Sequence, residues 1–477
     1  MKLPFYVDMR PNHSGVTGSC FHMKAVFPNR NTYSCLVDCG LFQGKYETSL
    51  NDVPLFPFIK NANTLVLTHN HVDHVGRVLE LVRNGFRGNI ITSEQTFGLL
   101  DKAWRDCVKI EKLNATKANR LPRYTSPNVT EALRHVTPLE FGKKFQIHPN
   151  IRLTLFQNGH VFGSAMVLIE IKSGFEGYEP INLFFTGDYN NQNYFFSVPE
   201  IPDEVKKMPL NIICESTYGE DSRQDGRQAV FEKNIVEQIN KGKEIFIPTF
   251  AFERAQIVLA ILNKLQKEGR LGLNIPIYVE GKLLKEYTSH YIKNASMYFD
   301  KIHRDEILPQ NLHWIIKPNQ KKDMLGDSVT KIIIASGGML SFGPSQSYIS
   351  YLVSNHNAVI HFTGYQCEGT IGHSLNVASK TGELLELMGK LVKVECSVFY
   401  TSEFSSHALQ SGLLQLISQF QNRRSINLNH GSQAAKLNFA KKIILAKLAK
   451  EVGILSRENI YRFSPYGLEK VVSTSTI

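Results

Sequence analysis

A cluster of three histidines and one aspartate follows an apolar segment early in the chain. His69, His71, Asp73 and His74 fall within six positions, directly after residues 64–68. Two imidazoles two residues apart at a strand end can bind one metal ion, while Asp73 and His74 on the next turn can face a second ion. A solvated surface loop has no need of this arrangement, so the spacing predicts a metal centre.

Further ligands stand after two other segments that read as strands. His160 follows residues 151–156 and Asp188 follows residues 181–185, each beside a glycine that permits close backbone approach. His160 offers a third nitrogen to the first ion, and Asp188 offers a carboxylate that can bridge both ions. Asp38 could bind metal itself or orient a ligand histidine through its free ring N–H, and we favour orientation. Spacing alone assigns no role to His407.

The elements that must position these residues change in style along the chain. Up to about residue 220, short strands are joined by loops, and Ser93 or Thr92 can cap a helix whose Phe97, Leu100, Trp104 and Cys107 share one face. Beyond that point helices and strands alternate, which predicts a parallel sheet with helices on its faces. The helices are expected at 228–239, 254–267, 283–293 and 345–353, and the strands at 244–248, 275–279, 331–335 and 358–362. The last part returns to polar loops and closes with a helix at 433–452.

The composition is that of a soluble globular protein. The chain has 477 residues, 42% of them apolar and 20% charged, which allows two or three domains. The net charge of +11 favours a polyanionic partner. Seven cysteines without a CxxC pair favour a reducing compartment. The N-terminus does not read as a signal peptide and no apolar segment is long enough to span a membrane, so we expect a cytoplasmic protein.

These motifs resemble the metallo-β-lactamase superfamily, and more closely its β-CASP branch of nucleic-acid hydrolases. Asp38, the cluster 69–74, His160 and Asp188 match the first four superfamily motifs in order. The segments that resemble β-CASP landmarks are Cys214–Gly219, Pro248–Gln256, Ser336–Leu340, Gly364–Thr370 and Phe404–His407. Val16–Cys20 and Gly40–Gly44 are similar to bacterial and archaeal relatives of the polyadenylation cleavage nuclease. The resemblance covers nearly the whole chain.

The resemblance implies an α/β fold with two domains. A four-layer αββα metallo-β-lactamase domain would be interrupted by an inserted Rossmann-like β-CASP domain with a parallel sheet. The expected boundaries place the first domain at 1–219, the insertion at 220–371 and the return of the first domain at 372–477. The long separation between Asp188 and His407 accommodates such an insertion.

The resemblance also implies a zinc-dependent ribonuclease that hydrolyses phosphodiester bonds of single-stranded RNA, as an endonuclease with 5′–3′ exonuclease action as an option. His69, His71 and His160 would hold one zinc ion, and Asp73, His74 and His407 the other, with Asp188 between them; manganese is the alternative metal. The two ions would activate a water for attack on phosphorus. His373, held by Glu215, would protonate the leaving oxygen. Asp73, Asp188, Glu215 and His373 are therefore the expected catalytic residues.

Other residues carry weaker expectations. His430 could orient a ligand, contact phosphate or serve structure alone. Lys109, Lys112, Arg120 and Tyr124 could guide RNA, with a solvated basic face as the alternative. Two departures from the family pattern stand out: His373 comes one residue earlier than expected, and Glu253 replaces a small residue.

Three other functions are alternatives to the ribonuclease. A DNA nuclease of the Artemis type is less favoured because those relatives lack a histidine at the last ligand motif, where this chain has His407. A small-molecule metallo-hydrolase fits the inserted domain and the charge poorly. A non-catalytic paralogue would have lost ligands. A homodimer is a further expectation from the family alone.

Overall fold

The computed structural model describes residues 4–44, 47–55, 59–222, 228–327, 329–364, 366–401 and 404–473. Tyr365, within the expected segment Gly364–Thr370, lies outside the described residues. The chain forms two compact units. The first comprises Met1–Asn193, Val198–Arg223 and Ser406–Ile477, and the second comprises Tyr194–Ser197 and Gln224–Ser405. The first unit is therefore built from both ends of the chain.

Two sheets form the centre of the first unit. The eight-stranded sheet has the order β23-β22-β1-β2-β3-β4-β5-β6, and the seven-stranded sheet has the order β21-β20-β11-β10-β9-β8-β7. The strands of the first sheet are β1 (Tyr6–Pro11), β2 (Phe21–Val26), β3 (Thr32–Val37), β4 (Thr64–Val66), β5 (Asn89–Ser93), β6 (Val136–Leu139), β22 (Asn459–Ser464) and β23 (Gly467–Ser473). Those of the second are β7 (Lys144–His148), β8 (Ile151–Gln157), β9 (Ala165–Ile171), β10 (Ile181–Phe185), β11 (Pro209–Glu215), β20 (Asn422–Asn429) and β21 (Gly453–Ile454).

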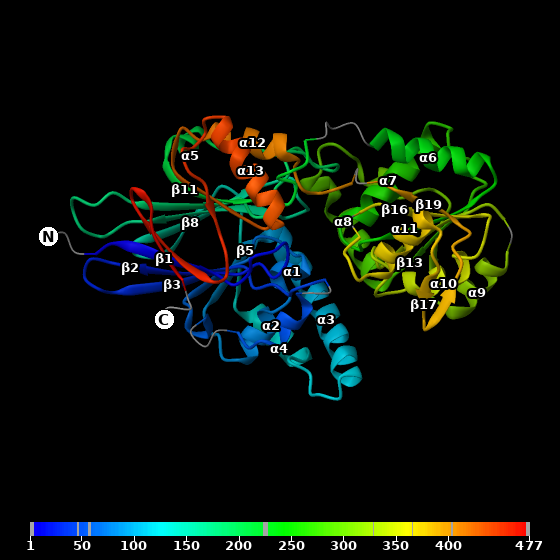
Figure 1. Cartoon of the computed structure of the whole chain (residues 1–477), viewed down its shortest axis with the longest axis horizontal. Helices are drawn as coiled ribbons and strands as arrows, with labels where there is room; N and C mark the ends of the chain where they lie inside the picture. The colour runs from blue at the N-terminus through cyan, green and yellow to red at the C-terminus, as the bar shows by residue number, and fades with distance from the viewer. Residues whose placement is uncertain are drawn as a thin grey trace. The chain divides into compact units, whose positions relative to one another are not determined.

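Helices cover the outer face of each sheet in this unit (Figure 1). The helices are α1 (Val72–Val75), α2 (Val78–Arg83), α3 (Glu94–Lys117), α4 (Ser126–Arg134), α5 (Asp203–Lys207), α12 (Gln410–Gln419) and α13 (Gln433–Leu445), with 3-10 turns η1 (Thr48–Asp52) and η2 (Ile59–Asn61). Apolar residues of both sheets, such as Val7 and Val167, share one core. The helices α2, α3 and α4 pack on the other face of the eight-stranded sheet, and α12 and α13 on the other face of the seven-stranded sheet. The expected αββα layers are confirmed.

The second unit is a parallel α/β domain. Its six-stranded sheet has the order β14-β13-β15-β12-β16-β19, and every pairing in it is parallel. Its strands are β12 (Glu244–Thr249), β13 (Ile277–Glu280), β14 (Leu312–Ile315), β15 (Ile332–Ser336), β16 (Ala358–Phe362) and β19 (Ser397–Tyr400), and a separate hairpin joins β17 (Leu385–Leu387) to β18 (Lys390–Val392). Its helices are α6 (Gln228–Asn240), α7 (Arg254–Lys267), α8 (Lys282–Tyr298), α9 (Pro318–Gly326), α10 (Ser345–Leu352) and α11 (Ile371–Thr381), with the 3-10 turn η3 (Arg304–Glu306).

Both faces of this parallel sheet are buried. Ile245 and Ile247 of β12 join the core under α7 and α8, while Phe246 between them joins the core under α10 and α11. Strands buried on both faces read as continuous apolar runs, which is why the alternation of such runs with helical patterns identified this part correctly. The Rossmann-like architecture is confirmed.

Two expected boundaries differ from the structure. The compact second unit continues past residue 371 to Ser405, because β19 adds to its sheet beside β16. The helix expected at 433–452 ends at Leu445, where Lys447 takes a left-handed backbone with φ 57°. The chain then turns back and forms β21 beside β20. Local helical pattern alone carries no information on such a tertiary pairing.

Candidate metal centre

Strand ends of the two sheets bring the candidate ligands together within the first unit. Asp38 follows β3, and the cluster 69–74 follows β4, which is the parallel neighbour of β3. Asp188 follows β10, Glu215 ends β11 and His430 follows β20, and these three strands are parallel neighbours. The carboxyl ends of parallel strands meet at one edge of a sheet, so residues over 200 positions apart converge there.

Three ring nitrogens form the first group. Nδ1 of His71 lies 2.9 Å from Nε2 of His69 and 3.1 Å from Nε2 of His160. Nitrogens that share one tetrahedral zinc ion stand about 3.3 Å apart, given Zn–N bonds of about 2.0–2.1 Å. These three residues and Asp188 could hold one ion. The chain's own donor set thus fits a histidine-rich metal site.

Asp73, His74 and His430 form a second group that could hold an ion. Oδ2 of Asp73 lies 3.9 Å from Nε2 of His74 and 3.9 Å from Nε2 of His430. Although both Nε2 atoms are buried, neither makes a well-formed hydrogen bond with any described residue. Buried polar atoms in native proteins usually have partners, so these two ring nitrogens are suited to bind a metal ion.

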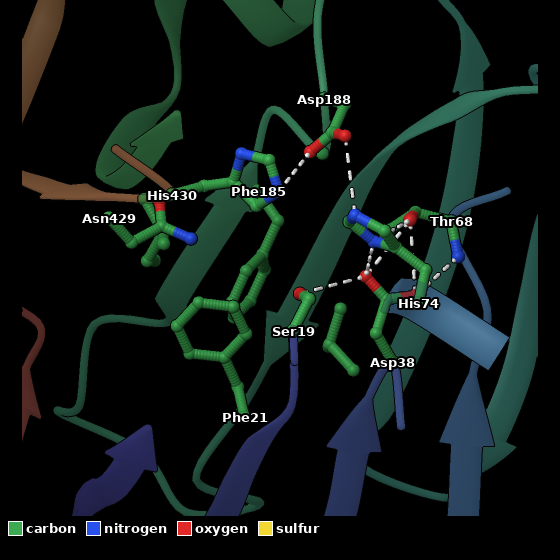
Figure 2. A pocket seen from close by; sticks show the side chains of 12 residues that line it. Ser19, Phe21, Asp38, Thr68, His74, Phe185, Asp188, Asn429 and His430 are labelled. Atoms are coloured by element: carbon green, nitrogen blue, oxygen red, sulfur yellow. Dashed lines mark hydrogen bonds and ion pairs between the residues drawn. The ribbon is translucent and has the colours of Figure 1, made fainter. Parts of the chain in front are cut away.

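Asp188 stands between the two groups. Its Oδ2 lies 3.5 Å from Nε2 of His160 and 3.2 Å from Nε2 of His74, and its Oδ1 lies 3.4 Å from Nε2 of His430. Figure 2 shows this carboxylate with His74 on one side and His430 on the other. Such a position suits a carboxylate that is shared by two ions.

In two of these histidines, the ring nitrogen that points away from the metal centre lies within hydrogen-bond distance of an acceptor oxygen. Nδ1 of His74 lies 2.7 Å from Oδ2 of Asp38. Thr68 and Ser19 also donate to this carboxylate, so Asp38 is fixed in place (Figure 2). The geometry agrees with the orienting role favoured from the sequence. Nδ1 of His160 similarly lies 3.0 Å from the carbonyl oxygen of Ser406.

Gly40 lets these loops approach one another. A Cβ atom on Gly40 would lie 1.6 Å from the carbonyl oxygen of Asp73. Ser19 donates its backbone N–H to the same carbonyl oxygen, and Gly40 donates to Ser19. The loop after β3 can therefore contact the metal loop only with glycine at this position.

Electrostatics in the first group favours neutral imidazoles. Burial, followed by repulsion from neighbouring histidines, lowers the pKa of His69 and His160 well below the usual value. Burial also lowers the pKa of His71, to about 4. A neutral imidazole has a lone pair for a metal ion, whereas a charged one has none.

Glu215 holds a histidine, but not the expected one. The two carboxylate oxygens of Glu215 lie 3.0 and 2.9 Å from Nδ1 of His407. Burial would lower the pKa of His407, but the carboxylates of Glu215 and Asp188 outweigh it and raise that pKa to about 9. His373 lies in the second unit, half-buried in the first turn of α11, where its N–H binds the Thr370 hydroxyl. The expected pairing of Glu215 with His373 is therefore corrected to His407.

The position of His430 is a second difference from the expectation. His407 was expected to join Asp73 and His74, yet His430 lies in that group. His407 lies instead with Asp188 and His430, and its Nε2 is 3.8 Å from Oδ2 of Asp188. Both histidines follow apolar segments and precede small residues, so spacing could not rank them.

The expected RNA contacts on α3 and after it divide into two pairs. Lys109 and Lys112 are exposed. Tyr124 is only 2% exposed and belongs to the core, so it cannot stack a base. Arg120 binds the buried carboxylate of Glu111, which also accepts from Arg123. The sequence pattern missed this role because Glu111 lies nine residues from Arg120.

Thr217, Ser19 and Thr68 were not predicted individually as site residues. The hydroxyl of Thr217 lies 3.0 Å from Nδ1 of His430. Thr217 lies in the expected segment Cys214–Gly219, Ser19 lies in Val16–Cys20, and Thr68 precedes His69. Nothing else distinguishes them in the sequence, because hydroxyl residues are common in loops.

Two family models match parts of this chain. The Beta-Casp domain model matches residues 255–375, which lie in the second unit. The model of a Zn-dependent metallo-hydrolase RNA specificity domain matches residues 391–455, which include His407 and His430. Both matches make the chain similar to the β-CASP branch of the metallo-β-lactamase superfamily.

Proteins similar to this chain occur in archaea and bacteria. Transcription termination factor FttA of Methanocaldococcus jannaschii is 28% identical over 422 residues, which cover 85% of this chain and 64% of that protein. FttA of Pyrococcus horikoshii is 29% identical over 413 residues, covering 82% of this chain and 61% of that protein. Ribonuclease TTHA0252 of Thermus thermophilus is 27% identical over 429 residues, covering 88% of this chain and 92% of that protein. The chain thus spans less than two thirds of these two archaeal relatives.

Among the described residues, no helix is long and apolar enough to cross a membrane.

Proposed function

We propose that this protein is a ribonuclease that hydrolyses phosphodiester bonds of single-stranded RNA with the help of two zinc ions. The observation that carries the proposal is the position of Asp188 between two histidine groups. The name of one relative, a ribonuclease, and the description of the matched RNA specificity domain support the choice of substrate. The net charge of +11 supports a polyanion.

His69, His71 and His160 would hold one ion, Asp73, His74 and His430 the other, and Asp188 would contact both. The mostly nitrogen donor set favours zinc over manganese. When bound, such a pair of ions lowers the pKa of a coordinated water and offsets the charge that develops on the phosphoryl oxygens. His430 thus takes the ligand position for which the family resemblance implied His407.

His407 is then available for the leaving oxygen. A departing 3′-oxygen needs a proton, and an imidazole paired with a carboxylate can carry one at neutral pH. Glu215 supplies that carboxylate at 2.9 Å. Its two oxygens also accept from the backbone N–H groups of Tyr189 and Thr217, which fix the carboxylate in position. We therefore assign the proton donor to His407 and not to His373.

Cleavage of matched substrates tests this proposal. A 5′-labelled single-stranded RNA and its DNA equivalent are incubated with the protein, with and without a chelator. The proposal expects internal cuts in RNA that chelation abolishes and zinc restores, with little cutting of DNA. Equal cutting of DNA would favour the DNA nuclease. Absence of RNA cleavage by protein loaded with zinc or manganese would refute the proposal.

A further inference from the structure

The loop that carries His430 is joined to the segment after β11 by several short contacts. Ser216 donates its hydroxyl to the carbonyl oxygen of Asn429 at 2.6 Å, and its backbone N–H to the carbonyl oxygen of His430 at 3.1 Å. A Cβ atom on Gly431 would lie 2.6 Å from the carbonyl oxygen of Ser216. Segment 215–217 therefore fixes the backbone of the loop, although over 200 residues separate the two in the chain.

Thr217 is the member of this segment that contacts the imidazole. Its Oγ1 lies 3.0 Å from Nδ1 of His430 and 3.1 Å from the carbonyl oxygen of the same residue. Thr217 donates its single hydroxyl hydrogen to this carbonyl oxygen, which has a second lone pair beside the one used by the Ser216 N–H. Oγ1 is then left as an acceptor, and Nδ1 of His430 must carry the hydrogen that it receives.

The other ring nitrogen of His430 consequently keeps its lone pair. Nε2 is buried, faces Oδ1 of Asp188 at 3.4 Å and makes no well-formed hydrogen bond with any described residue. The opposite tautomer would direct an N–H at the second group, where a metal ligand must offer a lone pair. The tautomer of His430 thus decides whether the second group has three donors or two.

We infer that Thr217 is a positioning residue that fixes the tautomer of His430 and so sets the affinity of the second metal site. Thr217 acts on the metal ion only through His430 and does not bind the ion itself. This inference rests on the proposed two-ion function. The same logic applies to His74, where Asp38 takes the corresponding hydrogen, but a neutral hydroxyl makes a more selective test.

Zinc titration of the metal-free protein against a chelating indicator measures both sites. Thr217→Val keeps the side-chain volume and removes the hydroxyl, so affinity for the second ion should fall by about 10–100-fold while the first is unchanged. Thr217→Ser should restore the affinity. Ser216→Ala is the matched control, because it removes a neighbouring hydroxyl from the same loop contact without touching the imidazole.

The outcomes separate this inference from the proposed function. Wild-type protein that binds fewer than two ions would contradict the two-ion proposal itself. If wild type binds two ions and Thr217→Val binds both equally tightly, only the role of Thr217 is refuted. The same refutation follows if Ser216→Ala weakens the second ion as much, since the effect would then be on the loop. Melting curves of the metal-free variants identify any loss of folding.

Discussion

At the metal centre, the partner of one ring nitrogen determines what the other can do. Asp38 accepts from His74, the carbonyl oxygen of Ser406 accepts from His160, and Glu215 accepts from His407. Metal-binding histidines need such acceptors, because the hydrogen has to be on the nitrogen away from the ion. These partners come from three segments of the chain that are far apart in sequence, so the site depends on the fold of the first unit.

His407 gives the sharpest prediction at the scale of residues. If it protonates the leaving oxygen, His407→Ala should cut RNA roughly 10²–10⁴-fold more slowly. A substrate with sulfur in place of the 3′-bridging oxygen leaves as a thiolate without a proton, so the variant should cut it nearly as fast as wild type. Initial rates on both substrates, with metal content measured in parallel, test this.

His373→Ala is the control for that experiment. It should cut the oxygen substrate at close to the wild-type rate. If sulfur rescues His373→Ala but not His407→Ala, the proton donor is His373, as the family resemblance implied.

Part of the site could be predicted from residue types alone. The cluster 69–74 could be predicted because four residues of metal-binding types lie within six positions. His160 and Asp188 could be predicted because each follows an apolar segment. The partner of Glu215 could not be predicted from the sequence. It depends on β11 lying beside β10 and β20, and a pairing over 192 positions leaves no local pattern.

Among the elements, α3 was predicted well at its start. Ser93 accepts from the backbone of Thr96 as the N-cap, and Leu100, Trp104 and Cys107 are buried on one face. Phe97, which was expected to share that face, is 37% exposed. The segment after α3 was misread in part, because Arg120, expected as an RNA contact or a solvated base, binds the buried carboxylate of Glu111. A buried acid inside a basic stretch is the signal that could have been noticed.

The ion pairs of Glu111 should make the free energy of unfolding depend on pH. Burial would raise its pKa, but Arg120 and Arg123 outweigh burial and hold the pKa below the usual value of 4.5. A lowered folded pKa means that the stabilisation is complete above about pH 4.5 and is lost as the pH falls further. Glu111→Gln should therefore lower the melting temperature at pH 7 by roughly 2–6 °C, for a loss of about 1–2 kcal/mol.

The difference in melting temperature between Glu111→Gln and wild type should shrink as the pH drops below about 4.5. Glu140→Gln is the control, because Glu140 is an exposed acid paired with Lys143. A difference that stays constant down to pH 3 would show that the ion pair does not stabilise the protein through its charge.

For the molecule as a whole, the net charge of +11 predicts binding of RNA that weakens with salt. Each phosphate contact on a single strand contributes about 0.7 to the slope of log affinity against log salt. Lys109→Gln with Lys112→Gln should lower that slope by about 1.4 and leave metal content unchanged. Lys24→Gln with Lys172→Gln, at exposed positions outside α3, is the charge-matched control. If both pairs change the slope equally, α3 is not an RNA-binding face.

The central claim, two ions that share Asp188, is tested most directly by measuring bound zinc and RNA cleavage on the same samples. Wild-type protein should carry close to two zinc ions per chain. Asp188→Ala should carry fewer and cleave no RNA, because the shared carboxylate offsets the repulsion between the ions. His373→Ala should retain both ions. An Asp188→Ala protein that binds two zinc ions and cuts RNA at the wild-type rate would contradict the account.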